Sequence, residues 1–83
     1  MNKKRLLRRL TQGHLHNVDF GDFVNLVEGF GFRCVRKEGS HGIYVHPDVS
    51  ELLNLQPREG EAKPYQIRQF LKIIEKYSLQ LKE

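Results

Sequence analysis

The sequence predicts one small α+β domain, in which a short N-terminal helix precedes a helix, three antiparallel strands and a final helix. The chain has 83 residues, of which 39% are hydrophobic and 29% charged, and this composition allows one thin core. Apolar residues recur at helical spacing in residues 20–30 and after residue 64, while short apolar stretches bounded by Gly and Pro lie between. Two helices packed on one face of such a sheet would leave its other face in water.

The N-terminal half contains two predicted helices. Residues 3–10 form the first, with three leucines along one edge: Leu6, Leu7 and Leu10. Residues 11–17 are polar and form a connection. Asp19 suits the N-cap of a helix over residues 20–29, because its carboxylate can accept from the exposed backbone N–H groups of the first turn.

Three predicted strands follow. Residues 32–37 and 42–46 flank a cluster of turn-forming residues at 38–40, so they predict a hairpin. Residues 52–56 predict a third short strand, which ends at a proline.

The last predicted helix begins at Pro64, since proline suits the first turn of a helix. Its stripe at helical spacing consists of Ile67, Phe70, Leu71, Ile74 and Ser78. We expect residues 1–83 to form one domain, with a basic helix and linker over 1–18 and the core over 19–81.

The positive charge is concentrated at the N-terminus. Fourteen Lys and Arg against ten Asp and Glu give a net charge of +4, yet residues 1–9 hold five bases and no acid. Residues 10–83 therefore hold nine bases and ten acids, a net charge of −1. Two interpretations stay open: a basic arm that is drawn to phosphates, or a solvated helix face that keeps a small protein in solution.

Composition excludes several classes of protein. The longest apolar run is three residues, so no membrane-spanning helix is expected, and the basic N-terminus lacks the apolar stretch of a secretory signal. Cys34 is the single cysteine, so no internal disulfide can form and a cytoplasmic setting is expected.

Four histidines are the main candidates for chemistry: His14, His16, His41 and His46. They form no His-x-x-x-His pair and no Cys-x-x-Cys accompanies them, so we predict neither a metal site nor a cofactor. The glycines lack the Lys-Ser/Thr ending of a phosphate-binding loop.

His41 differs from the others in its neighbours. It follows the predicted turn, and Arg36 and Lys37 lie across that turn. An imidazole can take or give a proton near neutral pH, and beside cations it would meet an anionic substrate such as a phosphodiester. Alternatively, His41 shares strand parity with Ile43 and Val45, which would make it a histidine at the edge of the core.

Several strings around His41 resemble those of the HicA family of toxins. The central ones are Gly39-Ser40-His41, Ile43-Tyr44 and His46-Pro47. Four flanking segments agree as well: residues 18–24, 29–32, 53–57 and 62–68. The likeness covers about residues 3–81. It implies a fold like that of double-stranded-RNA-binding domains, an mRNA-cleaving ribonuclease of a toxin–antitoxin system, and a cognate antitoxin of the HicB type.

The resemblance also implies roles for single residues. The family's catalytic histidine corresponds to His41, whereas the second histidine that many members carry next to it is Gly42 here. The candidates for RNA binding are Arg36, Lys37, Ser40 and Lys63. Ser40 either holds the imidazole or completes the turn. Tyr44 and Tyr65 either stack on bases or pack at the core or its rim.

The implied mechanism is metal-independent transesterification, because RNA carries its own nucleophile in the 2′-hydroxyl group. His41 would move a proton in that reaction. Two other functions stay open: a non-catalytic RNA-binding module of the same fold, and a domain whose only ligand is the antitoxin.

Overall fold

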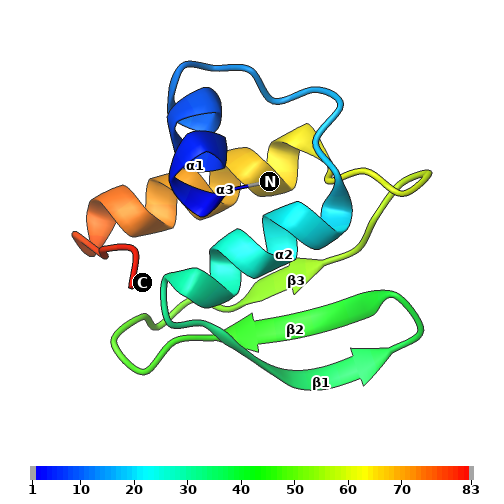
Figure 1. Cartoon of the computed structure of the whole chain (residues 1–83). Helices are drawn as coiled ribbons and strands as arrows, with labels where there is room; N and C mark the ends of the chain where they lie inside the picture. The colour runs from blue at the N-terminus through cyan, green and yellow to red at the C-terminus, as the bar shows by residue number, and fades with distance from the viewer. Residues whose placement is uncertain (1, 83) are drawn as a thin grey trace.

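Three helices lie on one side of a three-stranded antiparallel sheet in the computed structural model, which describes residues 2–82 (Figure 1). The elements are α1 (Lys3–Thr11), α2 (Phe20–Gly29), β1 (Arg33–Glu38), β2 (His41–Val45), β3 (Leu53–Leu55) and α3 (Pro64–Lys76). The predicted α+β class and the order of its elements are confirmed. Within the described part of the chain, no helix covers the other side of the sheet, which we call the open face.

The hairpin turn between β1 and β2 is tighter than the sequence predicted. Glu38 and His41 form the last pair of the two strands, so only Gly39 and Ser40 lie in the turn. Gly39 has a φ of +60°, whereas Ser40 is not among the residues with positive φ, which is the pattern of a type II′ turn. The strand bounds therefore differ slightly from the predicted ranges, which were 32–37, 42–46 and 52–56.

A β-bulge in β1 decides which side chains share a face. The register shifts between Cys34 and Arg36, which leaves Val35 as the extra residue. As a result, Cys34 pairs with the buried Tyr44 on the helix-covered face. The open face carries Arg33, Arg36, Glu38, His41, Ile43, Val45 and Asn54.

The core lies between the helices and the sheet and is centred on Phe70 of α3. The Phe70 ring is fully buried and meets three other rings edge-on, at centroid distances of 5.4 to 6.1 Å: Phe23, Phe30 and Phe32. Such aromatic pairs add roughly 0.5–1.5 kcal/mol each beyond the burial of their area. The same core includes leucines 53 and 55 of β3, so β3 is held to the helices from one side only.

The N-terminal helix is packed as part of this structure. Leu6 and Leu10 of α1 are buried in the core, where α1 packs against α2. The Arg9 guanidinium donates to the backbone oxygens of His16 and Asn17 and so holds the connection to α2. At least one of the five N-terminal bases therefore has a structural role.

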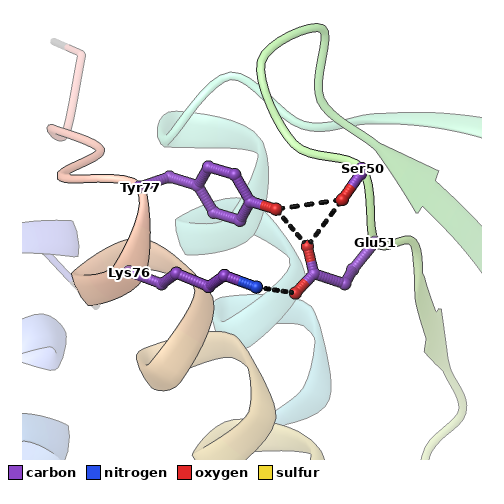
Figure 2. Close-up of polar contacts among 4 residues, drawn as sticks. All are labelled: Ser50, Glu51, Lys76 and Tyr77. Atoms are coloured by element: carbon purple, nitrogen blue, oxygen red, sulfur yellow. Dashed lines mark hydrogen bonds and ion pairs between the residues drawn. The ribbon is translucent and has the colours of Figure 1, made fainter.

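A polar network of Ser50, Glu51, Lys76 and Tyr77 connects the loop before β3 to the C-terminal end of α3 (Figure 2). The Tyr77 hydroxyl donates to the Glu51 carboxylate, and the Lys76 ammonium lies 3.1 Å from the other carboxylate oxygen. The Ser50 hydroxyl lies 3.0 Å from that of Tyr77. These hydrogen bonds, first that of Tyr77 and then that of Lys76, lower the pKa of Glu51 from 4.5 to about 2. The network holds the loop before β3 against the C-terminal end of α3.

Candidate active site

His41 is the first residue of β2, and its side chain lies exposed on the open face. His41 does share its face of β2 with Ile43 and Val45, but that face is the open face. The interpretation of His41 as a histidine at the edge of the core is therefore wrong. No hydrogen bond within residues 2–82 engages the imidazole, so the ring can meet a ligand from solvent.

A shallow hollow of about 290 Å³ surrounds His41 on the open face. Its polar lining consists of Arg36, Glu38, His41 and Asn54. The Arg36 guanidinium lies 3.5 Å from the Glu38 carboxylate, and both side chains are largely exposed. An exposed ion pair of this kind contributes little stability, so the guanidinium keeps donors available for a phosphate. The hollow thus combines an imidazole, a carboxylate and a cation.

Lys37 and Ser40 lie on the other side of the hairpin turn. They line a second hollow of about 470 Å³ between the turn and α2, together with Asn25 and Tyr44. Ser40 occupies the second central position of the turn, and none of the hydrogen bonds found in residues 2–82 joins its hydroxyl to the His41 ring. In this structure Ser40 is a turn residue.

Lys63 lies at neither of these hollows. It occupies the N-cap of α3, where its ammonium lies 6.0 Å from the centroid of the Tyr65 ring. It lines a third hollow, of about 500 Å³, with residues of the loop that precedes α3. The predicted site residues are therefore only partly brought together, since Arg36 alone shares the hollow of His41.

Gly42 is required by the packing of Tyr44. A Cβ atom at residue 42 would lie 2.7 Å from Cε1 of the Tyr44 ring. Tyr44 is 5% exposed, and burial raises the pKa of its hydroxyl above the usual value, with the neighbouring Cys34 and Glu28 adding to the rise. Tyr44 thus packs in the core, and a histidine at residue 42 would collide with its ring.

The other three histidines line neither hollow. The buried His46 accepts at Nδ1 from the backbone N–H of Asp48 at 3.0 Å, and its ring meets Phe32 edge-on at 5.2 Å. His14 and His16 are exposed in the connection between α1 and α2. In the described residues, no group of three His, Cys, Asp or Glu side chains is placed to hold a metal ion.

Two residues of the His41 hollow were missed by the sequence analysis: Glu38 and Asn54. Asn54 stands between two buried leucines of β3 and pairs with Ile43, so its parity alone places it on the open face. The alternation of buried and exposed residues in β3 could therefore have predicted from the sequence that Asn54 lies on the open face. The face of Glu38 could not be predicted in this way. Its position opposite His41 depends on the length of the turn, and a shift of one residue in the pairing moves a side chain to the other face of the sheet.

A family model described as HicA toxin of bacterial toxin-antitoxin matches residues 20–75. The match covers about two thirds of the chain and includes every residue that lines the His41 hollow and the hollow between the hairpin turn and α2. This chain belongs to the HicA toxin family. No curated protein and no solved structure matches it.

Membership of the HicA family places the site in a toxin of a toxin–antitoxin system, and HicA toxins are known for cleaving mRNA. It also implies a cognate antitoxin. The N-terminal helix α1 lies outside the matched residues. Across residues 2–82, every helix is too short or too polar to cross a membrane.

Proposed function

We propose that this HicA toxin is a metal-independent endoribonuclease of the bacterial cytoplasm, which cleaves mRNA with His41 as its central acid–base group. The observation that carries the proposal is the position of His41, exposed on the open face in one hollow with Arg36 and Glu38. A phosphodiester that enters this hollow meets a cation and a proton-transfer group together.

The reaction needs two proton transfers. The 2′-oxygen loses its proton and attacks the adjacent phosphorus, while the bond to the 5′-oxygen breaks and that oxygen takes up a proton. The products are a 2′,3′-cyclic phosphate and a free 5′-hydroxyl. One imidazole cannot perform both transfers at once, so we assign the first to the Glu38 carboxylate and the second to His41, which face each other across the turn. Arg36 offsets the negative charge that develops at phosphorus.

Lys37 and Lys63 extend the cationic surface away from the scissile phosphate. A strand that crosses the turn passes from the His41 hollow to the hollow lined by Lys37, and Ser40 lies at the crossing point. Contacts of this kind with phosphates position a strand without reading its sequence. They also make its binding depend on salt.

A HicB-type antitoxin would inhibit the enzyme by covering the hairpin turn. On the open face Ile43 and Val45 are only partly covered, and Val35 at the neighbouring bulge is 49% exposed, so the sheet offers apolar surface close to the basic Arg36. A partner that presents apolar and acidic groups would complement this surface. Complex formation is then expected to protect the amides of residues 38–42 from hydrogen exchange, whereas protection confined to α3 would contradict this arrangement.

The proposed chemistry is tested with purified protein and an unstructured mRNA. We expect the same cleavage rate with and without EDTA, and fragments that end in 2′,3′-cyclic phosphate. Cleavage that requires an added divalent ion would contradict the mechanism. A non-catalytic RNA-binding module would instead retain the RNA in a salt-dependent manner and leave it intact.

A further inference from the structure

The first turn of α3 presents an aromatic ring to solvent. Tyr65 is 57% exposed, in contrast to the buried Tyr44, which was the other tyrosine considered for base stacking. A single exposed apolar residue is common on protein surfaces and by itself indicates nothing. Tyr65 is distinguished by the way in which its ring is held and by the charges around it.

A buried amide holds the Tyr65 side chain in place. Gln66 is 3% exposed, and its Nε2 donates to the Tyr65 hydroxyl at 3.3 Å. The Oε1 atom of the same amide accepts from the backbone N–H of Gln56, also at 3.3 Å. The hydroxyl end of the ring is therefore tied to the residue that follows β3. An aromatic ring that is ordered in advance loses less entropy when a ligand binds to it.

Three basic side chains lie near the ring on its helix side. The Lys63 ammonium lies 6.0 Å from the ring centroid, and Arg68 and Lys72 line an adjoining hollow with Tyr65. Glu51 lines that hollow as well, but its carboxylate already accepts from Tyr77 and Lys76. Residues 64–74 contain no acid. No side chain of residues 2–82 caps the N-terminus of α3, whose dipole favours an anion. Two acids line the hollow on the loop side of the ring: Glu59 and Glu61. An anionic ligand is therefore favoured on the side of the helix.

Tyr65 lies at the same end of the molecule as His41. Gly42 pairs with Leu55 of β3, and Gln56 is the next residue of the chain. Chain geometry then places the Cα atoms of His41 and Gln56 at most about 13 Å apart. In Figure 1 the hairpin turn lies at the right-hand end of the molecule, and the end of β3 and the start of α3 lie in its right-hand half.

We propose that Tyr65 is a stacking platform for an unpaired base of the substrate RNA, with Lys63 and Arg68 contacting the phosphates beside that base. The inference rests on the proposed ribonuclease function and narrows its substrate to single-stranded RNA. Such an RNA would bind at Tyr65 as well as at the scissile phosphate in the His41 hollow. Every base has a flat π face, so such a platform strengthens binding without selecting a sequence.

The test measures the affinity of a short single-stranded RNA by fluorescence anisotropy, in a His41→Ala background that leaves the RNA intact. We expect Tyr65→Ala to weaken binding by roughly 5- to 100-fold, the loss typical of one stacked base. Tyr65→Leu, which keeps apolar bulk without a flat ring, is expected to lose as much. Tyr65→Phe keeps the flat ring but loses the hydrogen bond from Gln66, so its loss is expected to be smaller than that of Tyr65→Ala. The matched control is Leu52→Ala, because Leu52 is 52% exposed and lies just before β3, away from the turn.

The same affinities are measured with a fully paired RNA of the same length. It offers no free base, so Tyr65→Ala is expected to change its affinity little. Unchanged binding of single-stranded RNA by Tyr65→Ala would overturn the proposal, and so would an equal loss on the paired RNA. Loss of antitoxin binding with RNA binding intact would assign the ring to a protein interface instead and would also overturn it.

The failure of this proposal can be told apart from the failure of the proposed catalysis. If His41→Ala still cleaves RNA, the role of His41 is refuted, and the binding comparison is repeated on 2′-O-methyl RNA, which lacks the nucleophile. If His41→Ala is inactive but Tyr65→Ala binds single-stranded RNA like its parent, the stacking platform alone is refuted.

Discussion

Glu38 and His41 are the closing pair of the β1–β2 hairpin and face each other directly across a two-residue turn. Directly opposed residues of antiparallel strands have their Cβ atoms about 4.5–5.5 Å apart, so the carboxylate and the imidazole border the same hollow. Both side chains are exposed, and the proposed proton transfers depend on this pair.

Replacement of His41 by alanine is expected to slow RNA cleavage by at least about 100-fold, the lower end of what general acid–base groups contribute. The fold should survive, because the side chain is exposed and holds no partner in residues 2–82. Initial cleavage rates and thermal unfolding followed by circular dichroism measure the two effects. His14→Ala is the control, since His14 is an exposed histidine far along the chain from the hairpin. An equally active His41→Ala protein would refute the catalytic assignment.

Glu38→Gln is expected to slow cleavage without weakening RNA binding. The amide cannot accept the 2′-hydroxyl proton, so kcat should fall by about 100-fold. The change also removes a negative charge next to Arg36, so RNA should bind as tightly as before or more tightly. Single-turnover rates and RNA affinities separate the two effects. Glu75→Gln, at an exposed acid of α3, controls for net charge. Tighter binding with an unchanged kcat would reduce the role of Glu38 to electrostatic repulsion.

Gly42→Ala is expected to destabilise the protein by roughly 1–3 kcal/mol, the usual cost of overpacking, because the new methyl group would meet the Tyr44 ring. Tyr44→Leu should remove most of this extra cost, since the shorter side chain withdraws from the position of the clash. Urea unfolding of both single variants and the double variant gives the coupling between the two sites. Strictly additive effects would show that Tyr44 is not the reason for glycine at this position.

Stability at acid pH should depend on Glu51. Its pKa is lowered to about 2 in the folded protein from 4.5, so its ionised form is favoured by folding. The resulting stabilisation is fully present above pH 4.5 and is lost as the pH falls toward 2. The difference in unfolding free energy between the wild type and Glu51→Gln should therefore shrink across this range. Tyr77→Phe removes the main cause of the shift and should flatten the same dependence. A difference that stays constant with pH would contradict this.

The elements of the fold were predicted best where their signals are local. The helix over 20–29 was predicted with its observed bounds, because Asp19 caps it by accepting from the backbone N–H of Asp22 at 3.0 Å and Gly29 ends it. The last helix was extended too far, since the periodic pattern runs to Ser78, whose φ of +52° lies outside the helix. The spacing of apolar residues does not indicate at which residue the backbone leaves the helical conformation. The end of a helix that lacks a strong capping residue is therefore predicted poorly.

The sequence by itself determined the order of the elements and the short segments around His41 that resemble the HicA family, because periodicity, capping residues and short motifs act over a few residues. It also led to the prediction of His41, rather than the other three histidines, as the candidate for catalysis. Only the tertiary structure decided that Arg36, and neither Lys37 nor Lys63, shares the hollow of His41. For Arg36 and Lys37 the physical reason is strand register: a two-residue turn and the bulge at Val35 set it, and a shift of one residue would have turned these side chains to the opposite face. Lys63 lies apart because it is the N-cap residue of α3.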